Sequence, residues 1–509
     1  MKFVKALVLL IVIPAFGFGV SKWVLGDLNA ALAKSNLQFK TMNKLCSSHL
    51  PQSNPSIAGV CDNALPILLT QKASIVSGVV AILLLLSFYI AAIVAGKSRT
   101  KITRIFPPLV FISLVVLAIL VLVQGAILTY GVYLIEAKLF NTTHLIIIVM
   151  VGFGALAGGF GLIKSSFKLA SKQPLTIIGT KLDRHKQRKL FDFVENIANK
   201  LGARAPDNIV VGLEPNFYVT SGDVSLLDDD STLKGETLFM SLPLSRIITI
   251  EELTAIIGHE LGHFRGNDTY YSLKFAPVYA GLTHGLESMS TNIATIPAVS
   301  VLTYMIEAFH KNISTISRER EFAADRAATE VAKPKALATS LLKLSLYAHA
   351  WGNLENSVAD RLVKGQGTQN MSWLFSSIVK YDVSPEKIPE VIDDIANDSI
   401  AHPTDSHPPT IARIEKVGVN TSDIDHRELL LQKHNSIDLI EEYRVLEEKL
   451  TELQLQYYFA LGIEAANEED INYGAKLLSA FAAHMVLADG KVLAEEVDDA
   501  EAIGLELSD

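Results

Sequence analysis

Four long apolar runs in the first third of the chain constrain its fold more than any other feature. Two of them, "SGVVAILLLLSFYIAAIVAG" and "LVFISLVVLAILVLVQGAILTYGVYLI", contain no charged residue. A transmembrane helix needs about 20 apolar residues, and a helix buried in a soluble core rarely stays uncharged over such a length. The sequence therefore predicts a membrane domain over residues 1–170, with four transmembrane helices at about 4–24, 74–96, 105–135 and 144–163.

The first apolar run has two interpretations. Lys2 and Lys5 stand before it or at its start, as in a secretory signal peptide. However, the run is longer than a signal core and has no clear small-x-small cleavage site. These features favour an uncleaved membrane anchor over a cleaved signal peptide.

Basic residues beside the apolar runs predict the orientation. The segment "KSRTKITR", residues 97–104, joins the second and third runs, and three lysines follow the fourth, namely Lys164, Lys168 and Lys172. Positive residues close to transmembrane helices stay in the cytoplasm. Residues 25–73 then form an exoplasmic loop, and the rest of the chain faces the cytoplasm. We expect a multi-pass integral protein, in the plasma (inner) membrane if the cell is bacterial.

The chain has only two cysteines, Cys46 and Cys61, and both fall in the predicted exoplasmic loop. Disulfides persist outside the cytoplasm, so this position favours a Cys46–Cys61 bridge over two unrelated thiols. No CxxC motif or histidine pair accompanies them, which argues against a zinc site there.

The remainder of the chain has the composition of a soluble protein that is mainly α with a small β-sheet. Residues 185–203 predict an amphipathic helix, because apolar residues recur every three or four positions. Three segments predict strands: 207–213, 216–222 and 237–242. Residues 270–310 fit either soluble helices or a helical pair at the membrane surface. The formal net charge of -9 makes nucleic acid an unexpected partner.

The stretch "IIGHELGHFRGND" carries the strongest chemical signal. His259 and His263 are one helical turn apart, so their imidazoles emerge on one face at the separation of two ligands of a zinc ion. Glu260 lies on the same exposed side and is the candidate catalytic base. Thr249 and Glu252 fit a capping box at the start of this helix.

A catalytic zinc needs a third protein ligand, and "SREREFAADRA", residues 317–327, offers one. Glu321 is the candidate ligand. Asp325, one turn later on the same face, is placed to hydrogen-bond a zinc-binding histidine and fix its tautomer. Acidic residues at this spacing usually lie on a solvated face, but the surrounding alanines indicate a buried helix, where unpaired carboxylates are unfavourable.

Four motifs in order carry a family resemblance: "EPNFYVTSG", "TLFMSLPLSRIITIEELTAIIGHELGHFRGND", "SREREFAADRAA" and "SHPPTIARI". Over roughly residues 175 to 420 the chain resembles the membrane-bound gluzincin peptidases, which include the HtpX heat-shock proteases and the CaaX prenyl proteases. The resemblance implies an α+β zincin catalytic domain, placed at 171–430. It also implies one zinc ion per chain, held by His259, His263 and Glu321, with Glu260 as catalytic base.

The resemblance assigns two further residues. Asn216 would bind substrate beside an edge strand, and His407 would stabilise the tetrahedral intermediate. Apart from the resemblance, Arg413 is expected only to brace the loop. The sequence departs from the family at Phe217, where a small residue is usual, and this puts the placement of Asn216 in doubt. The alternative for His407 is a loop histidine positioned by the two prolines that follow it.

These observations imply a membrane-anchored zinc metalloendopeptidase. The resemblance alone implies its substrates, membrane or membrane-associated proteins, which it would cleave with a zinc-activated water in protein quality control. Its partners would be protein or peptide substrates and the lipid bilayer. The four expected spans argue against prenyl-protein processing, because those relatives form a larger helical chamber. The alternative is a membrane scaffold, or a latent protease, that acts through partner binding. A His-His-Glu set leaves a coordination position open, which disfavours a structural zinc.

The C-terminal region, 431–509, is predicted to be helical and acidic and to bind a protein partner. Within it, residues 477–504 resemble the start of a helical domain of the tellurite-resistance B type, through the "ADGKV…EE" pattern. Asp489, Glu495 and Glu496 fit a solvated acidic face better than a divalent-cation site.

Overall fold

The computed structural model describes most of the chain and divides it into two compact units. One unit comprises residues 1–172 and 274–316, and the other comprises 173–273 and 317–509. The described residues are 2–35, 37–140, 142–170, 175–227, 232–265, 295–363, 366–382, 388–397, 408–461 and 472–473, with a few single positions between 275 and 286.

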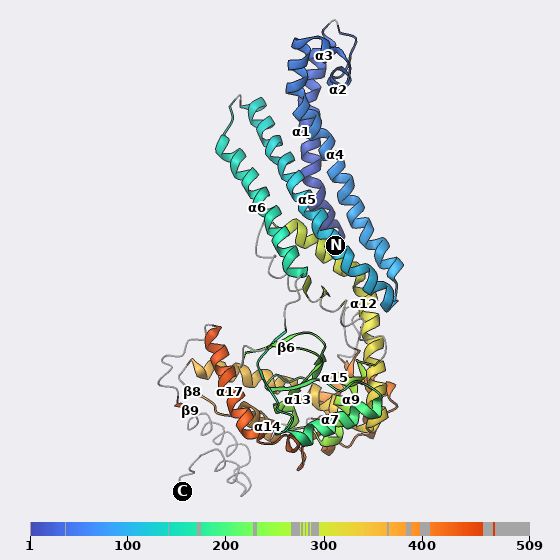
Figure 1. Cartoon of the computed structure of the whole chain (residues 1–509), viewed down its shortest axis with the longest axis vertical. Coiled ribbons are helices and arrows are strands. Elements are labelled where there is room, and N and C mark those ends of the chain that lie inside the picture. Colours follow the sequence, from blue (N-terminus) through green and yellow to red (C-terminus); the bar gives the residue numbers. More distant parts are fainter. Residues whose placement is uncertain are drawn as a thin grey trace. The chain divides into compact units, whose positions relative to one another are not determined.

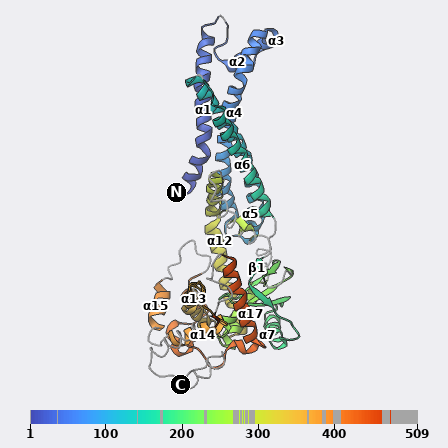
Figure 2. The same ribbon diagram turned by 90° about the vertical axis from the view of Figure 1, so that its left-hand side faces the viewer.

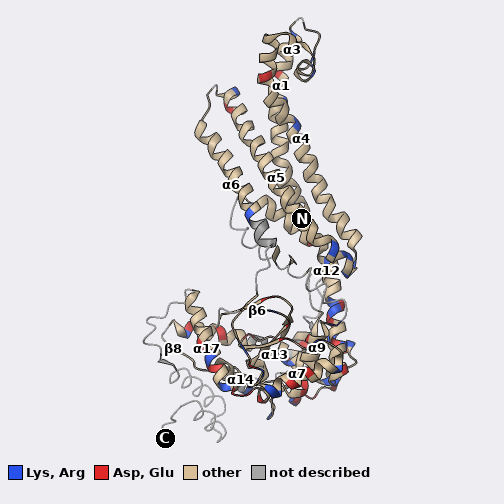
Figure 3. Ribbon diagram, viewed as in Figure 1, with Lys and Arg blue, Asp and Glu red and all other residues tan. Residues whose placement is uncertain are grey.

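The first unit is built on long apolar helices that carry few charges (Figures 1 and 3). Three of them are long and apolar enough to cross a membrane: α1 (Lys2–Ala33), α4 (Pro55–Ala95) and α5 (Arg99–Leu139). The fourth expected span coincides with α6 (Leu145–Ala170), whose described apolar part, Leu145–Gly161, is shorter. The structure therefore supports a multi-pass membrane protein with three to four spans.

The predicted exoplasmic loop, residues 25–73, is largely helical in its described residues. Helices α4 and α5 have 41 residues each, or about 60 Å at the rise of an α-helix. This is about twice the ~30 Å thickness of a hydrocarbon core. Apolar composition revealed only the middle of each helix, because the ends are more polar.

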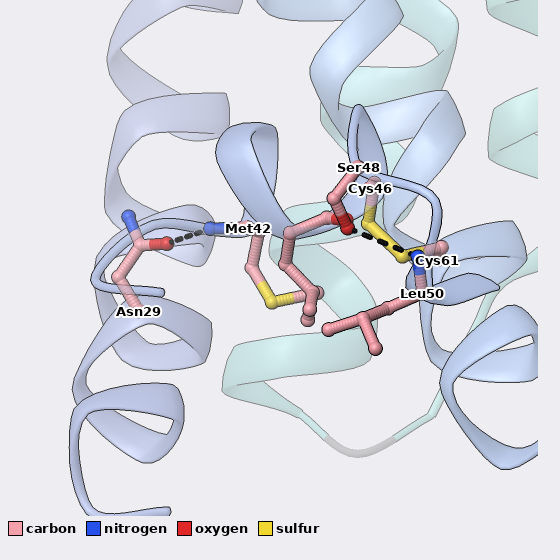
Figure 4. Close-up of a disulfide and its surroundings, with 7 residues drawn as sticks. Asn29, Met42, Cys46, Ser48, Leu50 and Cys61 are labelled. Atoms are coloured by element: carbon pink, nitrogen blue, oxygen red, sulfur yellow. Dashed lines mark hydrogen bonds between the residues drawn. A yellow bond between two sulfur atoms is a disulfide. The ribbon is translucent and has the colours of Figure 1, made fainter. Parts of the chain in front are cut away.

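A disulfide closes a small folded element between the C-terminal end of α1 and the N-terminal end of α4 (Figure 4). Helices α2 (Met42–Cys46) and α3 (Leu50–Ser53) lie between them. Cys46 and Cys61 are bonded, with their Cα atoms 5.4 Å apart. Asn29 Oδ1 accepts a hydrogen bond of 2.7 Å from the backbone N–H of Met42. The bond and the buried apolar residues around it tie α2 to α1 and α4.

Helix α12 (Ile296–Val331) begins in the first unit, and its residues from 317 onward belong to the second. Tyr304 packs against Phe3 and Phe88, with ring centroids 5.2 and 6.2 Å apart. Asn312 Nδ2 donates a 2.8 Å hydrogen bond to the Ala92 carbonyl of α4. This part of the 270–310 segment thus packs against the apolar helices. Most positions from 266 to 294 lie outside the described residues.

In its described residues the second unit contains three small sheets, the smallest with two strands, and a set of helices (Figure 2). The four-stranded sheet has the order β2-β3-β7-β4, with β3 and β7 parallel and the outer pairs antiparallel. Its strands are β2 (Gly179–Lys181), β3 (Asn208–Gly212), β7 (Thr237–Ser241) and β4 (Tyr218–Thr220). The three-stranded sheet is β1 (Leu175–Ile177), β5 (Val224–Leu226) and β6 (Thr232–Leu233), and β8 (Gln366–Gly367) pairs with β9 (Asn472–Tyr473). The three predicted strands are therefore present, as β3, β4 and β7.

Helices surround these sheets, and their buried residues form two main apolar clusters. They are α7 (Arg188–Leu201), α8 (Leu242–Ser245), α9 (Ile250–Gly262), α13 (Pro334–Leu362), α14 (Met371–Asp382), α15 (Ile388–Asn397), α16 (Thr410–Lys416) and α17 (Tyr443–Ala460), with 3-10 helices η2 (Thr421–Asp423), η3 (His426–Leu429) and η4 (Ser436–Leu439).

Helix α17 belongs to this core, although the sequence places it in a separate C-terminal region. Leu450 and Leu455 are buried with residues of α7 and α9. The Glu447 carboxylate is fully buried and receives hydrogen bonds of 2.6 and 2.7 Å from Arg246 and one of 2.9 Å from Asn370. The expected boundary at residue 430 thus falls inside one folded unit. Residues 477–504 lie outside the described part of the chain.

Candidate metal centre

The helix that carries the two histidines starts at the predicted capping box. The backbone N–H of Thr249 donates to Glu252 Oε2 at 2.7 Å, and the N–H of Glu252 donates to Thr249 Oγ1 at 3.2 Å. These bonds satisfy two of the free N–H groups at the start of α9. The helix ends at Gly262, with His263 as its C-terminal cap.

Two glycines of α9 allow α12 to approach closely. A Cβ atom at Gly258 would lie 3.2 Å from the Ala328 Cα, and one at Gly262 would lie 3.2 Å from the Ala324 Cα. Side chains at either position would push the helices apart. The glycines of "GHELGH" and the alanines of "AADRAA" therefore bring Glu321 to the histidines.

His259, His263 and Glu321 form a compact cluster of possible metal ligands. One ligand atom from each lies within 4.8 Å of the others. His259 Nε2 is 3.5 Å from Glu321 Oε2, and His263 Nε2 is 3.6 Å from Glu321 Oε1. Two imidazole nitrogens and one carboxylate suit zinc and leave a fourth position open. The donor set therefore fits a catalytic zinc.

Asp325 contacts the outer nitrogen of His259. The carboxylate is fully buried, and its Oδ1 atom lies 2.9 Å from His259 Nδ1. A hydrogen on Nδ1 donates to this oxygen and leaves the lone pair of Nε2 for a metal. Burial opposes protonation of His259, but hydrogen bonds to Asp325 and Glu321 raise its pKa to about 9. The acidic neighbours thus favour positive charge at this position.

Arg413 of α16 completes the cluster, and sequence reasoning gave it too small a role. Its guanidinium donates to Asp325 Oδ1 at 2.7 Å and to Oδ2 at 3.0 Å, and it lies 3.7 Å from Glu321 Oε2. Burial favours the neutral Asp325 carboxyl, but bonds from His259 and Arg413 lower its pKa. The motif "SHPPTIARI" contains Arg413, which was the sign available in the sequence. Arg413 is 88 residues from Asp325, however, and only the fold brings the two side chains together.

Glu260 lies next to the cluster and beneath the edge strand β4. The backbone N–H of Val219 in β4 lies close enough to the Glu260 carboxylate to favour its charged form. Burial raises the pKa of the Glu260 carboxyl to about 7. Among the described strands, β4 pairs only with β7, so its other edge is free. The metal site therefore adjoins a carboxylate that is able to accept a proton and a strand edge that is open in the described residues.

The structure does not bring Asn216 into this cluster by any described contact. Its side chain is exposed, and its Oδ1 atom accepts a 2.9 Å hydrogen bond from the N–H of Phe217. Phe217 is buried in the core of the unit, which explains why a large residue is accommodated there. Asn216 thus shapes the turn that leads into β4. His407 lies outside the described residues.

Asp325→Asn is expected to weaken zinc binding by about 10- to 100-fold, as is usual for residues that orient a ligand. The amide still accepts a hydrogen bond but no longer holds a negative charge beside His259. Zinc affinity is measured by competition with a chromogenic chelator. Asp192→Asn, on the exposed surface of α7, is the matched control and should bind zinc as the unmodified protein does. Equal affinities in all three proteins would contradict the assigned role.

A His-His-Glu cluster beside a glutamate, in a chain with helices apolar and long enough to cross a membrane, fits the class of membrane metallopeptidases. Comparison with known proteins agrees. Residues 185–419 match the model of peptidase family M48. Peptidase family M48 is generally zinc-dependent, and the cluster supplies a suitable ligand set. The protein is a membrane-associated metalloprotease that resembles the HtpX proteases.

The curated relatives are named as HtpX homologues. The "Protease HtpX homolog" of Archaeoglobus fulgidus is 24% identical over 277 residues, covering 52% of this chain and 73% of the relative. That of Thermococcus kodakarensis is 24% identical over 254 residues, covering 46% and 74%. "Protease HtpX homolog 2" of Sulfurisphaera tokodaii is 24% identical over 331 residues, covering 60% and 94%. No solved structure matches the chain.

Proposed function

We propose that the protein is a zinc metalloendopeptidase that binds one zinc ion through His259, His263 and Glu321. The observation that carries this proposal is the convergence of the three ligand side chains beside the Glu260 carboxylate. Because three protein ligands leave one position open, the site suits hydrolysis better than a structural role. This favours the protease over a scaffold.

The residues of the site suggest a division of labour. Zinc supplies Lewis acidity, which polarises the peptide carbonyl and lowers the pKa of water. Glu260 accepts the proton of the attacking water and delivers it to the leaving amine. Asp325 and Arg413 hold His259 in the tautomer and orientation that metal binding needs. From the resemblance, His407 would stabilise the developing oxyanion.

The free edge of β4 offers a place for an extended substrate. A peptide that adds a strand to this edge would form main-chain hydrogen bonds beside Glu260. Asn216 stands at the start of β4, where it would contact such a peptide. Recognition through the main chain is compatible with many sequences, as an endopeptidase of unfolded segments requires.

The membrane helices suggest where these substrates are. The basic residues between α4 and α5 support a cytoplasmic catalytic domain, and the Cys46–Cys61 bridge supports an exoplasmic location for α2 and α3. Membrane and membrane-associated proteins would therefore be the substrates, in quality control, at the plasma (inner) membrane of a bacterial cell. The catalytic domain would extend through α17, and the acidic segment after it would bind a protein partner.

Metal removal tests the proposal. The detergent-purified full chain should cleave reduced, unfolded casein, and 1,10-phenanthroline should abolish the cleavage. Zinc added after the chelator is removed should restore it, with one zinc per chain by mass spectrometry of the metal. Cleavage that survives complete loss of zinc would overturn the proposed chemistry. Absence of cleavage from a zinc-loaded protein would favour a scaffold or a latent protease.

A further inference from the structure

An apolar groove of about 480 Å³ lies in the first unit, between the N-terminal turns of α1 and the start of α12. Figure 2 shows the N-terminus of α1 beside this end of α12. The groove is lined by four apolar side chains and one charged side chain: Val4, Val8, Leu9 and Ile296, and Lys5. It is separate from the metal centre and has no role in the proposed hydrolysis.

Lys5 is exposed and has no ion-pair partner among the residues that the structure describes. Two ion pairs lie toward the far end of these helices: Lys138 contacts Asp27, and Glu136 lies 3.4 Å from His144. An unpaired lysine at the end of an apolar helix extends its ammonium toward the lipid headgroups. Among the described residues that line the groove, Lys5 is therefore the one cation, and it has no ion-pair partner there.

The walls of the groove face outward along one side of α1. The side chains of Val4, Val8 and Val12 are 58%, 51% and 56% exposed and recur at every fourth residue. This stripe lies on a helix that is long and apolar enough to cross a membrane, so its surroundings are acyl chains. A hydrocarbon chain is thus the natural occupant of the apolar walls.

We infer that the groove between α1 and α12 binds an anionic phospholipid, with an acyl chain along Val4, Val8 and Ile296 and the phosphate on Lys5. The apolar walls and the unpaired cation match the two halves of this ligand. A zwitterionic lipid has the same acyl chain but gains less from the lysine, because its own headgroup carries a positive charge. The site should therefore discriminate between headgroups.

The test measures lipid retention by the full chain. The protein is reconstituted with phosphatidylcholine and phosphatidylglycerol, extracted in mild detergent, and its bound lipids are counted by native mass spectrometry. Lys5→Gln should lower the retention of phosphatidylglycerol about fivefold, as expected for one lysine at the membrane surface. Retention of phosphatidylcholine should stay unchanged.

Two further variants separate the groove from general electrostatics. Lys34→Gln removes an equally exposed lysine just beyond the other end of α1, and it should leave lipid retention unchanged. Val8→Trp should fill the groove and lower the retention of both lipids. Because Val8 is half exposed, the larger ring has room in the groove without displacing buried residues, and folding is expected to be preserved.

The outcomes decide the inference. It stands if Lys5→Gln acts only on phosphatidylglycerol and Val8→Trp acts on both lipids. It is overturned if Lys5→Gln retains phosphatidylglycerol like the unmodified protein, or if Lys34→Gln has the same effect. Unchanged retention in Val8→Trp would also overturn it, because the acyl chain would then lie outside the groove.

Discussion

Glu260→Gln is expected to abolish peptide hydrolysis while zinc stays bound. The Glu260 carboxylate is not one of the three clustered ligands, so the substitution leaves the ligand set complete. Glutamine has nearly the same volume but cannot accept a proton from water. Because general-base catalysis contributes about 10²- to 10⁴-fold, the cleavage rate should fall by that factor. The measurement pairs casein cleavage with zinc content per chain.

Glu251→Gln provides the matched control for this variant. It lies on the same helix, and its carboxylate forms an exposed ion pair of 3.1 Å with Lys333. Cleavage by this control should equal that of the unmodified protein. If Glu260→Gln kept its activity, another group would have to accept the proton. If it lost zinc, Glu260 would be a ligand and the assignment of Glu321 would fail.

Lys343→Met is expected to destabilise the catalytic unit by about 3–5 kcal/mol, the usual effect of leaving a buried charge unpaired. The Lys343 side chain is fully buried in α13, and its ammonium donates to Glu252 Oε2 at 2.9 Å and to the Ile247 carbonyl at 3.2 Å. Glu252 also caps α9. Loss of the lysine therefore strains the start of the helix that carries both histidines.

Denaturant titration of the solubilised full chain, followed by tryptophan fluorescence, measures this change in the free energy of unfolding. Lys335→Met is the control on the same helix, because its pair with Glu428 is exposed on both sides. It should change stability by less than about 1 kcal/mol. The double variant Lys343→Met/Glu252→Gln should recover part of the loss. Equal effects of the two lysine variants would contradict the argument.

Features that depend on neighbouring residues were predictable from the sequence. Uncharged apolar runs predicted the helices α1, α4 and α5, because crossing a membrane needs only an apolar stretch of sufficient length. The capping box at Thr249 and Glu252 and the one-turn spacing of the two histidines follow from helix geometry alone. The spacing of apolar residues predicted the helix α7 and the strands β3, β4 and β7 that precede α9.

Tertiary structure decided the features that join distant parts of the chain. The lengths of α4 and α5 exceed their apolar runs, and in α4 the added turns carry Cys61, which is bonded to Cys46. The charged helix α17 gave no local sign that Glu447 would be buried against Arg246, 201 residues away. Such contacts depend on how whole helices and strands pack together, and local sequence patterns do not predict that packing.

The metal centre also combines features that the local sequence determines with features that only the tertiary structure determines. The sequence by itself determined which side chains are able to bind zinc, because two histidines and a glutamate in helical segments restrict the chemistry. Only the fold brought His259 within hydrogen-bonding distance of Asp325, 66 residues away, and added Arg413 to the pair. The physical reason is the close packing of α9 on α12 through Gly258 and Gly262, a complementarity of two surfaces that becomes defined only when both helices are in place.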